Sequence, residues 1–167
     1  MINMQKIKGK VWLFGDHVDT DQIIPAERLT SDNNDKLGTF AFEKVRPGMA
    51  AQVKKGDVIV AGRNFVSGSS REHAPRALLQ IGISCVVAES YARIFYRNSI
   101  NVGLLPVQCK IEAAEGDILS VDFDQGLIKN ETQRKEWKFD PFPPFVRDLI
   151  EKGGLMAKIK EEKRCSK

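Results

Sequence analysis

The sequence has few of the residues that hold metal ions or clusters. It contains three cysteines, at positions 85, 109 and 165, and two histidines among 167 residues. The cysteines are odd in number and far apart, so they lack the short spacings typical of zinc or iron–sulfur ligands. Cys85 lies beside Val86 and Val87 and is interpreted as a small core residue. We therefore expect no metal site in this chain alone.

Long apolar runs are also missing from the sequence. No stretch approaches the roughly 18–20 apolar residues that a membrane-spanning helix needs. Residues 1–10 are polar and lack the hydrophobic region of a secretory signal. Because unpaired cysteines are typical of reducing compartments, we expect a cytoplasmic protein that does not associate with a membrane.

A large excess of one charge is absent from most of the chain. The formal net charge is +4, but residues 151–167 hold six basic and three acidic side chains, which leaves +1 for residues 1–150. Nucleic-acid-binding domains usually present a basic face. A basic tail on a nearly neutral body is more typical of a solvated helix end. We therefore expect no nucleic-acid partner.

The length and composition are those of one globular domain. With 42% hydrophobic and 29% charged residues, the chain can bury a core without disulfides. We expect residues 1–167 to form a single domain. Apolar strand-like runs alternate with helical periodicity in its first two thirds, which predicts right-handed parallel crossovers. The expected strands are 8–14, 57–61, 84–88 and 102–107, and the expected helices are 74–83 and 91–100.

The remaining segments have other patterns. Residues 117–129 alternate in polarity around a glycine-containing turn and predict a β-hairpin. The C-terminal tail, 144–167, is expected to be helical, with an amphipathic helix that Gly153 and Gly154 end. Residues 16–36 are polar and predict a long flexible loop, a length that is often functional. Together the patterns indicate an α/β domain with parallel and antiparallel strands.

The segment Gly68–His73 carries the strongest chemical signal. It lies between an expected strand and an expected helix, where backbone N–H groups and the helix dipole favour an anion. Ser69 and Glu72 have the spacing of a capping box, which is a purely structural interpretation. A cation such as Arg71 is unfavourable near a helix N-terminus unless it faces an anion. A substrate carboxylate would explain Arg71, and Ser70 would add further donors.

The acidic cluster Asp16, Asp19 and Asp21 suggests a calcium loop at first sight. With Asp16 as its first position, Asp21 would stand at the sixth, where an EF-hand loop needs glycine. Asp16 and Asp19 are better interpreted as turn-forming residues. Asp21 could orient a catalytic group, whereas His73 is expected to be a helix-surface residue.

Several separate motifs occur in order along the chain. They are Gly9–Trp12 with Phe14–Asp16, Asp19–Pro25, Gly56–Gly62, Gly68–Ala74, Ala88–Asn98 and Asn101–Leu104. With these motifs, residues 8 to 163 resemble the small subunits of the 3-isopropylmalate dehydratase family, the detached swivel domain of the aconitase superfamily. The resemblance implies a swivelling β/β/α three-layer domain with a mostly parallel sheet plus a smaller antiparallel sheet.

The resemblance also implies an activity and a partner. Members of this family supply one part of a heteromeric hydro-lyase, inactive without its large subunit. The reaction moves a hydroxyl group on a small hydroxy-dicarboxylic acid by dehydration and rehydration. A 4Fe–4S cluster is expected in the large subunit and none in this chain, and iron of that cluster would act as a Lewis acid on the departing hydroxyl.

The resemblance assigns roles to the residues already singled out. Ser69 is implied to be the general base, acting as an alkoxide. Serine can do so only where N–H donors, a helix N-terminus and a cation stabilise the oxyanion. Ser70 and Arg71 are implied to bind the substrate, and Asp21 to face a histidine of the large subunit and fix its tautomer.

The segment after Pro25 departs from one pattern of the family. Homoaconitase-type members have Tyr-Leu-Arg-Thr there, whereas this chain has Arg28, Leu29 and Thr30 without the tyrosine. An inward Arg28 would favour a substrate with an additional carboxylate, because an unpaired buried guanidinium is costly. If Arg28 faces solvent, Leu29 could pack on an isopropyl group.

The substrate therefore stays open at this point. Isopropylmalate in leucine biosynthesis is the first expectation, with homoaconitate, citramalate-type and dimethylmalate-type acids as alternatives. A non-catalytic anion- or RNA-binding module is the alternative of a different class. The nearly even charge of residues 1–150 argues against it.

Overall fold

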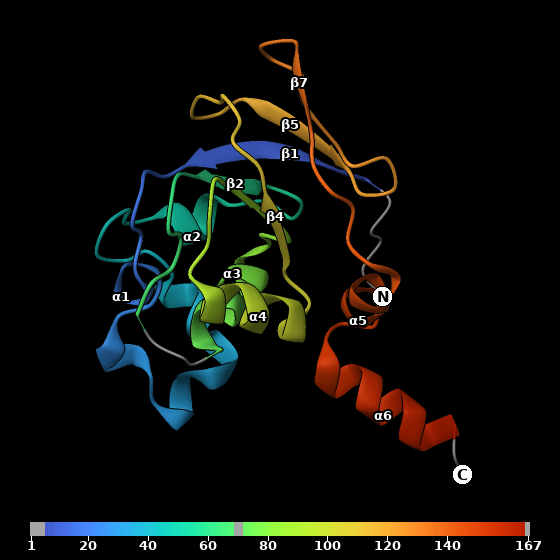
Figure 1. Ribbon diagram of the computed structural model, residues 1–167. Coiled ribbons are helices and arrows are strands. Elements are labelled where there is room, and N and C mark those ends of the chain that lie inside the picture. The colour runs from blue at the N-terminus through green and yellow to red at the C-terminus, as the bar shows by residue number, and fades with distance from the viewer. Residues whose placement is uncertain (1–5, 69–71, 166–167) are drawn as a thin grey trace.

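A seven-stranded mixed sheet with helices packed against it forms the protein in the computed structural model, which describes residues 6–68 and 72–165 (Figure 1). The strands are β1 (Lys6–Leu13), β2 (Val58–Ala61), β3 (Cys85–Ala88), β4 (Leu105–Gln108), β5 (Ile118–Asp122), β6 (Leu127–Asn130) and β7 (Lys135–Lys138). Their order across the sheet is β4-β3-β2-β1-β5-β6-β7.

The first four strands are parallel and build one half of the sheet. β2 and β3 are buried on both faces, which explains why their sequences are continuously apolar. Helix α3 (His73–Ile81) connects β2 to β3, and α4 (Arg93–Val102) connects β3 to β4. Both helices lie on the same side of these strands in Figure 1. Pro106 in the edge strand β4 has no N–H to offer a further strand.

The other half of the sheet is antiparallel and shares β1 with the parallel half. β5 pairs with the first part of β1, from Lys6 to Lys10, and β6 and β7 follow as antiparallel neighbours. A Cβ on Gly9 would lie 2.1 Å from the carbonyl oxygen of Gly56, so glycine permits the close approach of that turn to β1. The expected combination of parallel and antiparallel parts is confirmed, and β1 joins them into one sheet.

Two hydrophobic cores lie on opposite faces of the sheet. Alternate residues of each parallel strand belong to different cores: Ile59 and Val86 face α3 and α4, whereas Val58 and Val87 face the other side. The second core includes residues of β5, β6 and helix α5 (Pro144–Glu151). The parallel half and β5 and β6 share this second core, while α3 and α4 cover the other face of the parallel half, which agrees with the expected β/β/α layers.

The strands and helices expected from apolar periodicity are present, with bounds shifted by a few residues. The predicted hairpin is β5–β6, and α5 ends where Gly153 and Gly154 begin, both with positive φ. α6 (Leu155–Cys165) completes the helical tail and packs with α5 against α4. β7 was not expected from the sequence. None of the helices in the described part of the chain combines the length and apolar character that crossing a membrane requires.

The segment expected to be a loop, 16–36, contains short helices instead. They are α1 (Thr20–Ile23), η1 (Ala26–Arg28) and the start of η2 (Ser31–Phe40), and α2 (Met49–Gln52) follows before β2. The segment is therefore a connection built of short helices, and its expected flexibility stays a prediction. Ile23 and Leu37, each 0% exposed, anchor this connection in the core, so apolar residues and not helix length fix its path.

A buried carboxylate holds the turn between β4 and β5 to the end of β6. Asp117 Oδ2 accepts hydrogen bonds from Asn130 Nδ2 (3.0 Å), the Ala114 N–H (2.9 Å) and Gln133 Nε2 (2.9 Å). These donors, Asn130 first, hold the pKa of Asp117 below its usual value of 3.8. The carboxylate therefore stabilises the fold fully above the unfolded-state pKa, and this contribution is lost as the pH falls through the lower folded-state pKa.

We expect Gln133→Ala to reduce the free energy of unfolding most at neutral pH, because the charged carboxylate loses one of its donors. The difference from the unsubstituted protein should shrink between about pH 5 and pH 2 as Asp117 takes up a proton. Urea denaturation at several pH values measures it, with Gln125→Ala on the exposed β5–β6 turn as a matched control. A constant difference at every pH would show that the carboxylate charge contributes nothing.

Candidate functional site

The carboxyl ends of β1, β2 and β3 meet at one edge of the parallel half. The segments that leave them there are 14–19, 62–68 and 89–92. Ligands of open α/β sheets usually bind outside this edge. The acidic cluster lies in or directly after the first of these segments, and Gly68 ends the second. The topology itself therefore brings the acidic cluster and the start of the Gly68–His73 segment to the same side.

Asp16 connects the ends of β1 and β2. Its Oδ1 accepts a hydrogen bond from the Arg63 N–H at 2.7 Å, and the His17 N–H donates to the Arg63 carbonyl at 2.8 Å. The Arg63 N–H is also the main reason that the pKa of Asp16 lies below its usual value. A Cβ on Gly62 would lie 1.8 Å from Asp16 Oδ1, so this connection requires glycine there. Asp16 is a structural residue that stabilises a neighbouring turn.

A capping box that was not expected from the sequence begins α1. Asp19 Oδ1 accepts from the Gln22 N–H (2.8 Å) and Gln22 Oε1 accepts from the Asp19 N–H (2.9 Å), which begins α1. Helix α3 begins at His73 with Glu72 as its N-cap. The Glu72 carboxylate accepts from Arg76 Nη2 at 3.1 Å. The box predicted between Ser69 and Glu72 includes residue 69, which lies outside the described residues, so it stays a prediction.

Asp21 lies at a pocket of about 270 Å³ between α1, η1 and the start of α3. The pocket is lined by Thr20, Asp21, Ile24, Ala26, Leu29, His73 and Ala74. Asp21 Oδ1 accepts from the Ala26 N–H at 2.9 Å, and the structure shows no donor among the described residues for its Oδ2. Gly68 is adjacent, since a Cβ there would lie 2.9 Å from Thr20 Oγ1. Asp21 therefore lies close to Gly68, the first residue of the Gly68–His73 segment.

The structure separates the three residues expected after Pro25. Leu29 lines the pocket, whereas Arg28 and Thr30 are not among the described residues that line it. The Arg28 guanidinium donates to both carboxylate oxygens of Glu43, at 2.8 and 3.3 Å, and lies 4.3 Å from the centre of the Phe40 ring. Its hydrogen bond with Glu43 raises the pKa of Arg28. Thr30 is exposed and precedes η2.

Ser69, Ser70 and Arg71 lie outside the described residues, so their predicted roles stay predictions. His73, expected on a helix surface, is half-buried and lines the same pocket as Asp21. Its position at the first turn of α3, two residues after the Ser-Ser-Arg run, was the sequence signal that could have predicted this. Ile24 was likewise not expected, although it follows the acidic cluster directly.

The backbone at this edge adopts an unusual conformation. His17, Asn64 and Val66 have φ values of 56°, 53° and 60°. They are three of the five non-glycine residues with positive φ among the residues that the structure describes. Each such residue costs about 1–3 kcal/mol and persists only where its surroundings hold it, a situation common at functional sites. For the β-branched Val66 the conformation is especially unfavourable.

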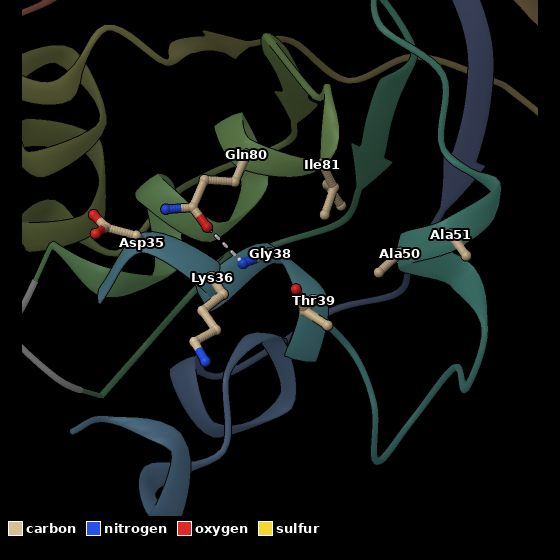
Figure 2. Close-up of a pocket in the computed structure, with 8 residues that line it drawn as sticks. All are labelled: Asp35, Lys36, Gly38, Thr39, Ala50, Ala51, Gln80 and Ile81. Carbon is tan, nitrogen blue, oxygen red and sulfur yellow. Dashed lines mark hydrogen bonds between the residues drawn. The ribbon is translucent and has the colours of Figure 1, made fainter. Parts of the chain in front are cut away.

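A second hollow, between η2, α2 and α3, lacks the features of a reactive site. Figure 2 shows its lining residues, with Asp35 and Lys36 pointing in different directions. Gln80 Oε1 accepts from the Gly38 N–H at 2.7 Å across one side of it. The hollow therefore belongs to the packing of η2 on α3. The candidate site is the pocket beside Asp21 at the carboxyl edge of the sheet.

Proteins with assigned names resemble the chain over nearly its whole length. The 3-isopropylmalate dehydratase small subunit of Halothermothrix orenii is 51% identical over 158 residues, 93% of this chain and 96% of that protein. The methanogen homoaconitase small subunit of Methanothermobacter thermautotrophicus is 49% identical over 150 residues, 90% of this chain and 88% of that protein.

A solved structure and a domain family agree with these relatives. The crystal structure of 3-isopropylmalate dehydratase from Methanocaldococcus jannaschii matches with a TM-score of 0.90 and 41% identity, covering 96% of this chain and 97% of that one. The aconitase C-terminal domain family matches residues 49–112, which contain β2, β3, β4 and the helices between them. The chain therefore belongs to the aconitase-type family of isopropylmalate dehydratase and homoaconitase small subunits.

Proposed function

We propose that this chain is the small subunit of a cytoplasmic hydro-lyase that interconverts 2-isopropylmalate and 3-isopropylmalate in leucine biosynthesis. The observation that carries the proposal is the pocket at the carboxyl edge of the sheet. It combines Asp21, the apolar side chain of Leu29 and the neighbourhood of Gly68 in one place. A small subunit of this kind works with a large subunit, and the carboxyl edge is the face we assign to that contact.

In this proposal, Ser69 removes the proton from the carbon next to a substrate carboxylate. Its alkoxide is stabilised by N–H donors ahead of α3 and by Arg71, which also binds a carboxylate together with Ser70. Asp21 is well placed to act on a group from outside the chain, because its Oδ1 is fixed by Ala26 and its side chain is exposed. We assign it to a histidine of the large subunit, whose tautomer it would fix.

The described cysteines do not suit an iron–sulfur cluster. Cys85 is fully buried in the core and Cys109 is half-buried, and burial raises the pKa of both thiols, whereas cluster ligands are thiolates. Among the described residues, no three potential metal ligands gather in one place. We therefore assign the 4Fe–4S cluster to the large subunit, where it would supply Lewis-acid assistance to the departing hydroxyl.

The surroundings of Leu29 favour an isopropyl group as the variable part of the substrate. Leu29 and Ile24 give one wall of the pocket an apolar surface. Arg28 is the cation that could have attracted an additional carboxylate, but its guanidinium already pairs with Glu43 through two hydrogen bonds. A substrate with a third carboxylate would have to compete with Glu43 for that cation.

The test combines the purified chain with its large subunit, restores the cluster under anaerobic conditions and measures kcat/KM for a panel of malate derivatives. We expect isopropylmalate to be the best substrate, and neither subunit to be active alone. A higher kcat/KM for homoaconitate or for a citramalate-type acid would overturn the substrate assignment while leaving the reaction class intact. Inactivity on the whole panel would overturn the proposed function.

A further inference from the structure

Residues 64–67 form an irregular continuation of β2 that is held from both sides. On the side of β1, Val18 O accepts from the Val66 N–H at 2.7 Å and from the Ser67 N–H at 3.3 Å. The Thr20 N–H then donates to Ser67 O at 3.0 Å. These contacts lead directly to Gly68, so the path of residues 64–67 determines where the Gly68–His73 segment begins.

On the side of β3, Ser90 holds the same segment through its backbone and its side chain. Its carbonyl accepts from the Phe65 N–H at 3.0 Å, and its hydroxyl oxygen accepts from the Asn64 N–H at 2.8 Å. The Ala92 N–H donates back to Phe65 O at 3.1 Å, and the ring of Tyr91 lies edge-on to the ring of Phe65. On this side of the segment, the hydrogen bond from the Asn64 N–H to the Ser90 hydroxyl is therefore the one that a side-chain substitution can remove.

Asn64 is the point at which the chain leaves the regular strand. Its φ of 53° is left-handed, and its Nδ2 lies 3.3 Å from Nδ1 of His17, itself left-handed. One residue thereby links the ends of all three strands: β1 through His17, β2 through its own backbone and β3 through Ser90. A strained conformation of this kind is kept only by such contacts.

We propose that Ser90 is a positioning residue for the reaction: its hydroxyl fixes Asn64 in the left-handed conformation and thereby sets the position of Gly68, the residue that precedes Ser69 in the sequence. The inference rests on the proposed function, because the proposed function assigns the general base, Ser69, to the segment that begins at Gly68. Ser90 would then act on the site indirectly, through residues 64–67, and its own side chain would not touch the substrate.

Three variants of the small subunit, each assembled with its large subunit, test the proposal. In Ser90→Ala we expect kcat to fall by about tenfold to a hundredfold, since small displacements of a reacting group have effects of this size. KM should rise as well, by about threefold to tenfold, because Ser70 and Arg71, which are assigned to substrate binding, belong to the same segment. Ser90→Thr retains the acceptor oxygen and should keep kcat within about twofold of the unsubstituted complex.

Ser120→Ala is the matched structural control. Ser120 is buried in β5, far along the sheet from the carboxyl edge, and its hydroxyl donates to Glu131 at 2.8 Å. We expect Ser120→Ala to lower the Tm about as much as Ser90→Ala does, while kcat stays unchanged. Equal kcat values in Ser90→Ala and the unsubstituted complex, or equal losses in Ser90→Ala and Ser120→Ala, would overturn the proposal.

A second pair of variants tests the same idea through Asn64. Asn64→Gly accepts a positive φ without strain, whereas Asn64→Ala does not. If the backbone conformation positions the segment, Asn64→Gly should retain at least about fivefold more kcat than Asn64→Ala. Inactivity of the unsubstituted complex on every malate derivative would sink the proposed function instead, so the two failures are distinguishable.

Discussion

Replacing Ser69 with alanine is expected to lower the kcat of the assembled complex by about 10²- to 10⁴-fold, the range over which a positioned general base accelerates a reaction. Alanine removes the only atom proposed to accept the substrate proton, and a water molecule at the same place is a weaker and poorly oriented base. KM should change little, because the carboxylate contacts of Ser70 and Arg71 are retained. Steady-state kinetics on isopropylmalate measure both constants.

Two controls make this result specific to the proton transfer. The Ser69→Ala chain should co-elute with the large subunit and unfold at the same temperature as the unsubstituted chain, because a single hydroxyl ahead of α3 contributes little to the fold. Ser70→Ala should raise KM more than it lowers kcat, since Ser70 is assigned to binding. Turnover near that of the unsubstituted complex in Ser69→Ala would reject the general-base assignment.

A large loss of stability is expected from Asp57→Ala, a substitution far from the site. Asp57 is 5% exposed, and its carboxylate accepts from the Lys10 N–H (3.1 Å), Trp12 Nε1 (3.0 Å) and the Lys54 N–H (2.9 Å). Alanine leaves these donors without an acceptor, and the indole N–H of Trp12 is buried. We expect the free energy of unfolding to fall by about 3 kcal/mol or more, since each unsatisfied buried donor costs about 1–3 kcal/mol.

Denaturation in urea, followed by tryptophan fluorescence, measures this loss. The matched control is Asp122→Ala, because among the described residues the half-buried carboxylate of Asp122 accepts only from the backbone of its own turn, at residues 124 and 125. It should cost less than about 1 kcal/mol. A loss in Asp57→Ala no larger than that of the control would mean that water replaces the carboxylate without cost.

The fold could be predicted from the sequence where burial alone determines the structure. β2 and β3 are buried on both faces and therefore appear in the sequence as short continuous apolar runs, and α3 has apolar residues at helical spacing. β7 could not be predicted in this way. Its pattern is exposed except for the half-buried Trp137, so its strand conformation comes from pairing with β6 and not from its own residues.

The short helices between β1 and β2 show a different limit. α1 has four residues, too few to be stable by itself, and it forms where the Asp19–Gln22 capping box and the burial of Ile23 coincide. The Asp-x-x-Gln spacing was a readable signal of its N-terminus. η1 and η2 have no such signal, because contacts with distant parts of the chain hold them in place.

The candidate site was predictable to the level of its segments but not of its side-chain directions. Topology dictates that the segments after β1 and β2 meet, whereas the sequence analysis singled out Asp21 and the Gly68–His73 segment separately. The direction of Arg28 depends on Glu43, which lies 15 positions further along the chain. No local pattern encodes that pairing, so the sequence alone left the roles of Arg28 and Leu29 open.

The position of β1 has a consequence for how the protein is made. β1 leaves the ribosome before the other described strands, yet it lies at the centre of the finished sheet, between β2 and β5. Its edge toward β2 can pair once the chain up to Ala61 has been synthesised, but its edge toward β5 stays unsatisfied until the chain up to Asp122 has been made. Pairings that span such long stretches of sequence form slowly and leave strand edges open to aggregation. The nascent chain therefore has its greatest need of chaperone protection before β5 emerges.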